Sequence, residues 1–449
     1  MKMSIPRPED STWTDDQWSA VATRGRSVLV AAAAGSGKTA VLVERIIRRI
    51  ADPNSPIDVD RLLVATFTKA AAAEMRHRIS EALEKALTAD PESEHLRRQL
   101  ALIPRAFITT LHSFCMEVIQ KHYQRIGLDP GFRIANETES ALLRQEQLEE
   151  LLEERYGEAA EGDPFWTLAD SFSGDKNDEG LFRLVQRLYD DSRSHPWPEH
   201  WLNECVRMFG ERRLEDDHPW LSSLRAAVRI ELQGAIGLLR EAIRLSRTPG
   251  GPEPYLANLD DDLTVLEYLL ELSEGHGWEH LYHAVQGAGF GKLKPCKGDH
   301  YDKELQERVK ELRNAAKDKL ATLREEWFSR SLEQYDEELK RMAPLMSALA
   351  ELVVTFGERY QAAKLDKGLV DFADLEHYCL RILSEEGATP DHPVPSAAAL
   401  EYREQFEEVL LDEYQDTNRV QEAIVALISR ERPGNRFMVG DVKQSIVRP

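Results

Sequence analysis

The sequence predicts an α/β protein in which a parallel β-sheet carrying a phosphate-binding loop is interrupted by a large all-helical insertion. Short apolar runs alternate with amphipathic helices in the first part of the 449-residue chain, and strand character returns near its end. A glycine-containing turn joins the first apolar run to a helix. The middle of the chain holds long amphipathic helices without convincing strands. Short apolar strands beside amphipathic helices are typical of a parallel sheet covered on both faces.

Five apolar segments are expected to form the strands. They are SVLVAAAA, RLLVATFT, RAFITTLH, FEEVLLDEYQDT and RFMVGD. The first three are followed by segments with apolar residues at helical spacing, namely TAVLVERIIRRI, KAAAAEMRHRISEALEKAL and SFCMEVIQKHYQRI. This order predicts strand–helix units of the kind that place parallel strands side by side.

The helical region extends from about Thr138 to Arg359. It contains ESALLRQEQLEELLEERY, RAAVRIELQGAIGLLREAIRL and KELQERVKELRNAAKDKLATLREEW. Turn residues interrupt it at SFSGDKNDEG, SHPWPEHW, RTPGGPEPY and GAGFGKLKPCKGDH. We therefore expect the sheet domain to consist of residues 1–137 and 360–449, with residues 138–359 as the helical insertion.

The composition is that of a soluble globular protein, with 42% hydrophobic and 30% charged residues. A chain of this length is expected to form about two or three domains. No apolar run approaches a membrane span of roughly 20 residues. The segment MKMSIPRPEDSTW lacks the apolar core of a secretory signal, so we expect a cytoplasmic protein without membrane contact. The four cysteines form no CxxC pair, which indicates isolated thiols rather than a zinc site or disulfides.

The formal net charge of −22 argues against a protein that coats nucleic acid without specificity. It leaves room for a local DNA groove, since contacts to phosphate need only a local cluster of donors. The lysines of GKLKPCKGDHYDK and ERVKELRNAAKDK are one candidate for a patch that faces duplex DNA. Acidic residues interleave with them, so a solvated helix face is an equally good interpretation.

The stretch AAAAGSGKT, which begins at Ala31, is the candidate phosphate loop. Small residues let backbone N–H groups converge on phosphates, and the dipole of the following helix favours anions. Lys38 can reach the β- and γ-phosphates, and the Thr39 hydroxyl can bind Mg²⁺. Ala32 replaces the first glycine of the common pattern, which is tolerable if that position is not at positive φ. The alternative is a plain strand–helix turn. The predicted nucleotide-binding residues of the loop are Ala34, Gly35, Ser36, Gly37, Lys38 and Thr39.

Two later strands end in residues suited to nucleotide hydrolysis. In LLDEYQDT, Asp412 can bind Mg²⁺ directly or through water, and Glu413 can orient and deprotonate the attacking water. A lone acidic pair at a strand end is more often solvated, but its occurrence after a phosphate-loop strand makes the catalytic interpretation stronger. In FMVGDVKQS, Gln444 can bond the γ-phosphate and sense its loss, although a glutamine in a turn is usually only solvated.

Six motifs occur in the order found in superfamily-one DNA helicases of the UvrD/Rep type. They are TWTDDQWSAV, AAAAGSGKT, ATFTKAAAAEM, ITTLHSF, LLDEYQDT and VGDVKQSI. Other segments, including DPGFRIANETE and LVDFADLEHYCL, are similar to the AddA (RexA) family of bacterial AddAB (RexAB) helicase–nucleases. The resemblance covers essentially the whole chain. It implies a RecA-like motor domain with a helical insertion, ATP and Mg²⁺ as cofactors, and 3′→5′ movement on DNA during double-strand break repair and homologous recombination. It also implies a heterodimer with an AddB (RexB)-type subunit.

The same resemblance assigns roles to residues that the sequence alone would not single out. Gln17 resembles the glutamine that reads the adenine edge; otherwise it is an ordinary polar residue near a helix start. Phe67 and Thr68 resemble a motif that contacts single-stranded DNA by stacking and phosphate hydrogen bonds. Thr110 and His112 resemble a second such motif. Without the family, Phe67 would be read as core and His112 as structural.

The chain departs from the family pattern after the sensor motif. The family continues with a second RecA-like domain, its arginine motifs and a nuclease, and the family's SIYRF is SIVRP here, with Val447 and Pro449 at the aromatic positions. Because those arginines stabilise the transferring phosphoryl group, we expect this chain to bind ATP without unwinding or cutting DNA.

Two other function classes stay open at this point. One is a phosphate-loop kinase or other NTPase acting on a small substrate, against which LLDEYQDT and ATFTKAAAAEM argue. The other is a non-catalytic DNA-binding module, against which the set of Lys38, Thr39, Asp412 and Glu413 argues. Another UvrD-like helicase is the nearest alternative within the superfamily.

Overall fold

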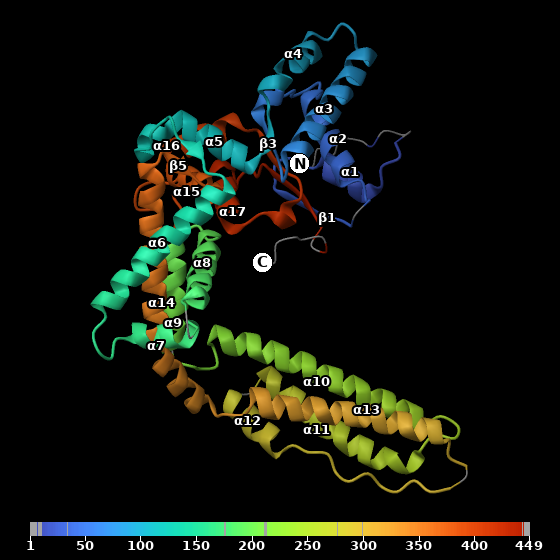
Figure 1. Ribbon diagram of the computed structural model, residues 1–449. Helices are drawn as coiled ribbons and strands as arrows, with labels where there is room; N and C mark the ends of the chain where they lie inside the picture. Colours follow the sequence, from blue (N-terminus) through green and yellow to red (C-terminus); the bar gives the residue numbers. More distant parts are fainter. Residues whose placement is uncertain are drawn as a thin grey trace. The chain divides into compact units, whose positions relative to one another are not determined.

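The computed structural model describes residues 7, 11–33, 35–174, 177–210, 213–275, 277–298, 300–441 and 443. Within these residues the chain forms two compact units. The sheet unit comprises residues 1–202 and 351–449, and the helical unit comprises residues 203–350. Figure 1 shows the path of the chain through both units.

The sheet unit is built on a parallel sheet whose order in space differs from its order in sequence. Its strands, in the spatial order β1-β7-β6-β2-β3, are all paired in parallel. A two-residue pair, β4 and β5, forms a separate parallel ladder. The bounds are β1 Val28–Ala31, β2 Leu62–Thr66, β3 Phe107–Thr110, β4 Arg133–Ile134, β5 Leu369–Val370, β6 Glu408–Leu411 and β7 Arg436–Gly440.

Alternate side chains of the central strands supply two separate cores, one on each face of the sheet. On one face Leu63 and Val409 pack with α5, α15, α16 and α17. On the other face Val64 and Leu410 pack with α1, α2, α3 and α4. The strand bearing Leu62 through Thr66 is buried at every position, as a strand covered on both faces must be. The bounds of these helices are α1 Asp15–Ala22, α2 Lys38–Ile50, α3 Lys69–Ala89, α4 Glu94–Leu102, α5 Leu111–His122, α15 Phe372–Leu383, α16 Ala397–Gln405 and α17 Arg419–Ile428.

A buried ion pair joins the helix after β1 to the first residue of β6. Arg45 on α2 donates from Nε and Nη2 to the two carboxylate oxygens of Glu408, at 2.8 and 3.0 Å. Its Nη1 donates to the carbonyl oxygens of Ala20 and Thr23, both at 2.8 Å. The guanidinium also lies over the ring of Phe437 on β7, 4.5 Å from its centroid. One side chain therefore ties together α1, α2, β6 and β7.

The remaining helices of the sheet unit belong to the segments that flank the helical unit. They are α6 Glu137–Glu158, α7 Pro164–Phe172 and α8 Glu179–Arg193. Two helices, α9 Pro198–Gly210 and α14 Leu332–Asp366, each contain a boundary between the two compact units. Short helical turns complete the element order: η1 Val59–Arg61, η2 Ile103–Arg105, η3 Tyr123–Ile126, η4 Glu253–Tyr255, η5 Leu323–Trp327 and η6 Tyr414–Asp416.

The helical unit has a core of its own, made largely of leucines. Its main helices are α10 Pro219–Ser246, α11 Leu256–Gly275, α12 Trp278–Gly287 and α13 Lys303–Thr322. Leu232 and Leu239 on α10 pack against Leu266 on α11 and Ala316 on α13, and Figure 1 shows α10, α11 and α13 side by side. A buried ion pair between Arg313 and Asp262, 2.6 Å apart, links α13 to α11.

The predicted fold class is confirmed as α/β with a parallel sheet and many helices. Each of the five segments predicted as strands contains one, from β1 to β7, and the four predicted interruptions all fall between helices. From residue 138 to 359 the described residues include no strand. The domain boundaries at residues 137 and 359 stay a prediction, since the compact units divide the chain elsewhere. No helix in the described part of the chain is both long and apolar enough to cross a lipid bilayer.

Replacing Arg45 with methionine is expected to lower the free energy of unfolding by about 3–5 kcal/mol, because it leaves the Glu408 carboxylate buried without its main partner. Chemical denaturation monitored by circular dichroism measures the loss. Adding Glu408→Leu should recover part of it, since no unpaired charge then remains. The control is Arg183→Met at an exposed position of α8, which should cost less than about 1 kcal/mol. Equal effects from the two arginines would contradict the central role of the buried pair.

Candidate functional site

The predicted site residues follow the carboxyl ends of neighbouring parallel strands. The loop with Lys38 follows β1, Asp441 follows β7 and Asp412 follows β6. Phe67 follows β2, and Thr110 is the last residue of β3. Because parallel strands end at one edge of the sheet, these residues share that edge, where open α/β sheets hold their ligands.

The phosphate loop has the backbone that its glycines predict. Gly35 and Gly37 have φ of 74° and 81°, a region that residues with a Cβ rarely adopt. Gly37 caps the N-terminus of α2. Among the described residues, Glu413 is the only non-glycine residue at positive φ. Ala32 is therefore not at positive φ, and the condition for its replacing the first glycine is met.

The side chains of the loop are placed to receive a polar ligand. Lys38 Nζ donates to the carbonyl oxygen of Ala32 at 3.1 Å, a bond that a phosphate could replace. Ser36 Oγ is buried and has no hydrogen-bond partner within the described part of the chain. Thr39 lies in the first turn of α2, whose N-terminus favours anions. These features fit a bound nucleotide phosphate. Ala34, the other predicted loop residue, lies outside the described residues.

Gln17 is attached to the phosphate loop. Its Oε1 accepts from Thr14 N at 2.9 Å, closing a capping box at the start of α1, and its Nε2 donates to Ser36 O at 2.9 Å. A Cβ at Gly37 would come within 3.3 Å of this Nε2. Both ends of the Gln17 amide thus have protein partners. A role in reading adenine stays a prediction, and it would use the second N–H or a rearranged side chain.

Asp412 and Glu413 form a half-buried acidic pair at the end of β6. Burial and the neighbouring Glu413 raise the pKa of Asp412, and Lys38 and Arg78 oppose that rise only in part. Glu413 N donates to Asp412 Oδ1 at 3.1 Å. Glu413 itself is in the left-handed region, with φ 52° and ψ 44°. Such a conformation costs roughly 1–3 kcal/mol, and strained residues of this kind cluster at functional sites.

The sequence analysis did not identify Gln415, which holds Glu413 in place. Gln415 Nε2 donates to Glu413 Oε2 at 2.7 Å and to Asp416 Oδ2 at 3.1 Å. Its Oε1 accepts from Asp441 N, just after β7, at 2.9 Å. A Cβ at Gly440 would lie 2.7 Å from that Oε1, so glycine is needed there. The amide therefore joins the ends of β6 and β7, and only its place beside the acidic pair could have indicated it.

Two of the predicted DNA-contacting residues also cap helices. Thr68 Oγ1 accepts from Ala71 N at 3.0 Å at the start of α3. Thr110 Oγ1 accepts from Ser113 N at 3.2 Å at the start of α5. A cap of this type contributes about 1 kcal/mol to helix stability. Thr68 is exposed and Thr110 is buried, so contact with DNA stays a prediction for both.

Phe67 and His112 lie beside the acidic pair. Phe67 is 52% exposed, which is unusual for a phenylalanine after a buried strand. Both residues line a small cavity of about 100 Å³ that Asp412 and Glu413 also line. His112 packs edge-on against the exposed ring of Phe372, with centroids 5.5 Å apart. The residues predicted to contact DNA and those predicted to act on the nucleotide therefore meet at one cavity.

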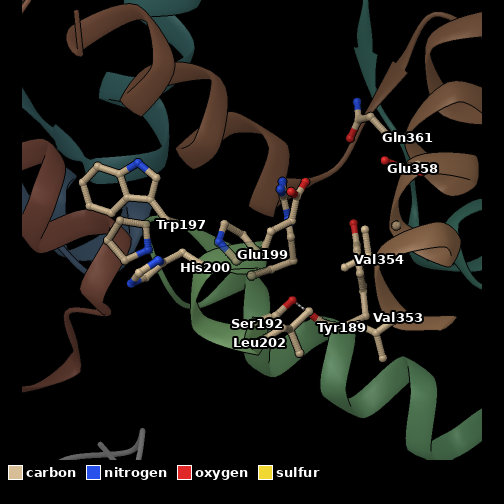
Figure 2. A pocket seen from close by; sticks show the side chains of 14 residues that line it. Tyr189, Ser192, Trp197, Glu199, His200, Leu202, Val353, Val354, Glu358 and Gln361 are labelled. Atoms are coloured by element: carbon tan, nitrogen blue, oxygen red, sulfur yellow. Dashed lines mark hydrogen bonds between the residues drawn. The ribbon is translucent and has the colours of Figure 1, made fainter. Parts of the chain in front are cut away.

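A wider cavity of about 530 Å³ elsewhere in the sheet unit contains none of the predicted residues. Figure 2 shows that Val353 and Val354 from α14 face it together with Tyr189 from α8. Trp197 and His200, from the turn after α8 and the start of α9, also line it. The chemistry of the residues, not the size of the cavity, identifies the candidate site at the strand ends.

Gln444 and the two departures at Val447 and Pro449 lie outside the described residues, so the sensor role of Gln444 stays a prediction. In the described part of the chain no group of three or more His, Cys, Asp or Glu residues could hold a metal ion. This agrees with a Mg²⁺ held by one or two protein ligands and by the phosphates of a nucleotide.

A family model described as the UvrD/REP helicase N-terminal domain matches residues 13–448. The chain belongs to this family. Three bacterial relatives, each named as the AddA-type component of an ATP-dependent helicase/nuclease, extend the likeness. The chain is 50% identical over 453 residues to the one from Bacillus pumilus (strain SAFR-032). It is 51% identical over 451 residues to the one from Bacillus licheniformis, and 49% identical over 447 residues to the one from Geobacillus thermodenitrificans.

These alignments cover 99% of the chain and 36% of each relative. The chain thus spans about a third of the length of the helicase/nuclease proteins that it matches. The predicted resemblance to UvrD/Rep-type helicases, and to the AddA proteins in particular, is confirmed.

Gly37→Ala is expected to weaken nucleotide binding at least tenfold, because the new Cβ would strain the loop at φ 81° and meet Gln17 Nε2 at 3.3 Å. Isothermal titration with an ATP analogue and Mg²⁺ measures it. The control is Gly25→Ala, which carries a similar backbone penalty at φ 70° with nothing within 4 Å. Gly25→Ala should lower stability by about 1 kcal/mol and leave nucleotide affinity unchanged. Equal loss of affinity in both variants would refute the loop assignment.

Proposed function

We propose that this chain is the ATP-binding motor portion of a DNA helicase of the AddA type. The observation that carries the proposal is the single cavity lined by Asp412, Glu413, Phe67 and His112 at the edge of the sheet that also bears the phosphate loop. A nucleotide site and a surface with an exposed aromatic ring for stacking are adjacent there. In this proposal the sheet unit is a RecA-like motor domain and residues 138–359 are its helical insertion.

The phosphate loop and the acidic pair have separate tasks in the proposed reaction. Lys38 releases the carbonyl of Ala32 and faces the β- and γ-phosphates, and the N–H groups at the start of α2 bind their oxygens. Asp412 and Thr39 hold Mg²⁺, which supplies charge neutralisation on the phosphate oxygens when bound. Glu413 accepts a proton from the attacking water, and Gln415 fixes its carboxylate relative to the end of β7.

The proposed DNA-binding surface uses Phe67 for base stacking, with Thr68, Thr110 and His112 contacting the backbone. Single-stranded DNA suits this surface because every base has a face that can stack on an aromatic ring. The wider role of a protein of this kind, including 3′→5′ movement, double-strand break repair and pairing with a partner of the AddB (RexB) type, rests on the relatives. The net charge of −22 supports a narrow DNA groove on an acidic protein.

Lys38→Ala and Glu413→Gln are expected to separate nucleotide binding from hydrolysis. Lys38→Ala removes the charge that faces the phosphates and should abolish ATP binding or weaken it at least 30-fold (about 2 kcal/mol), which calorimetric titration measures. Glu413→Gln keeps the shape of the side chain and removes the base. It should bind ATP as the unsubstituted chain does and slow single-turnover hydrolysis by about 10²–10⁴-fold. Equal loss of ATP affinity in both variants would contradict the assigned roles.

DNA binding is expected to be weak, to prefer single strands and to fall steeply with salt. Phe67→Ala should reduce the affinity for an oligothymidylate by about 5–100-fold, because base stacking on an aromatic ring contributes about 1–3 kcal/mol. Fluorescence anisotropy over a salt series measures this. Phe372→Leu is not a suitable control because Phe372 touches His112, whereas exposed Phe172 lies on α7 and Phe172→Ala should change nothing. Tight binding that salt does not weaken would count against the proposal.

A further inference from the structure

Glu376 on α15 is a buried carboxylate for which the proposed reaction has no task. It is 4% exposed and accepts hydrogen bonds from three different side chains. His112 Nε2, on α5, lies 3.1 Å from Glu376 Oε1. Gln421 Nε2, in the first turn of α17, donates to the same Oε1 at 2.6 Å. Asn418 Nδ2, at the cap of α17, donates to Oε2 at 2.9 Å.

The three donors keep this carboxylate charged. Burial raises the pKa of Glu376, but the hydrogen bonds from His112, Asn418 and Gln421 outweigh that effect and hold the pKa below its ordinary value. Hydrogen bonds to a charged acceptor are about twice as strong as neutral ones, and their removal inside a protein is correspondingly costly. The network is therefore a firm connection between α5, α15 and α17.

One end of the network lies at the proposed DNA surface. His112 belongs to the predicted DNA-contacting motif, lines the cavity with Phe67 and packs against the exposed ring of Phe372. A strand bound across Phe67 and His112 would therefore act directly on a side chain that Glu376 holds.

The other end lies at the nucleotide site. Gln421 lines the same cavity as Asp412 and Glu413. Asn418 follows Glu413 by five residues, and the segment between them is held by its own turns, since Asp416 N donates to Glu413 O at 3.0 Å and Thr417 N to Tyr414 O at 3.1 Å. Asn418 Oδ1 also accepts from Gln421 N at 2.8 Å, which fixes the start of α17. A shift of Asn418 or Gln421 is thus a shift of the segment that carries Glu413.

We propose that Glu376 is a positioning residue that couples single-stranded DNA at His112 to nucleotide at the Glu413 segment. This inference rests on the proposed function, because it takes His112 as a DNA contact and Glu413 as part of the nucleotide site. Glu376 itself touches neither ligand. It acts because His112 and Gln421 share one carboxylate oxygen, so that a change in one hydrogen bond alters the position of the other donor.

The coupling is reciprocal by thermodynamic necessity, so that each ligand raises the affinity for the other by the same factor. The test measures the affinity for a non-hydrolysable ATP analogue with Mg²⁺, in the absence and presence of saturating oligothymidylate. The ratio of the two affinities is the coupling factor, which we expect to lie at about 5-fold or more in the unsubstituted chain. In Glu376→Gln it should fall to within twofold of 1, while each separate affinity changes less than threefold.

The matched control is Asp374→Asn, two residues earlier on α15. Asp374 is also a buried carboxylate, but its partners are Lys364 and Arg193. Asp374→Asn should lower the melting temperature as Glu376→Gln does and leave the coupling factor unchanged. Adding Glu376→Gln to His112→Ala should cause no further loss of coupling, because both changes break one path. If Glu376→Gln does not fold, Gln421→Ala and His112→Ala provide the test, and each should lower the coupling factor without additivity.

Three results would overturn the inference while leaving the proposed function intact. They are binding of both ligands with no coupling in the unsubstituted chain, full coupling in Glu376→Gln, and an equal loss of coupling in Asp374→Asn. Failure of the unsubstituted chain to bind either nucleotide or DNA would instead refute the proposed function, and the inference with it.

Discussion

The buried contact between Arg45 and Glu408 is the interaction on which the site depends. The two residues are 363 positions apart in the chain, yet their hydrogen bonds fix the helix after the phosphate loop against the strand that leads to Asp412. Asp412 must stand at a set distance from Lys38 for the two to act on one nucleotide. A buried, bidentate pair suits this task because it has one favourable geometry, whereas apolar contacts tolerate sliding. The helical unit can be inserted between the two segments because Arg45 and Glu408 determine how those segments meet.

Much of the sheet follows from the sequence because burial on both faces leaves a local signature. The apolar run from Leu62 to Ala65 is buried at every position, and a continuous run of this kind is visible without any knowledge of its neighbours. The two-residue ladder of β4 and β5 was not predicted, since two residues carry no periodicity. The order of the strands was not predicted either, because β7 pairs with β1 and β6 through contacts between segments that are distant in the sequence.

The site was predictable where a residue acts through its own chemistry and not where it acts through a partner. Lys38, Asp412 and Glu413 belong to motifs whose composition indicates their task. Gln415 and Glu376 have ordinary sequence contexts, and their importance lies in which atoms they reach: the Asp441 N–H for one, and His112 with Gln421 for the other. No pattern of spacing encodes such contacts. The left-handed backbone of Glu413 is equally invisible in the sequence, since a glutamate rarely adopts it.

The position of β7 has a consequence for synthesis of the protein. This strand begins at Arg436, yet it lies between β1 and β6, with β1 at the edge of the sheet and bonded to β7. While the chain emerges from the ribosome, β1 and its phosphate loop therefore have no neighbouring strand until β7 is made. The helical unit, with its own core, can fold long before that. An unpaired strand edge of this kind is a template for aggregation, so the nascent sheet unit is a natural client for chaperones that shield exposed strands.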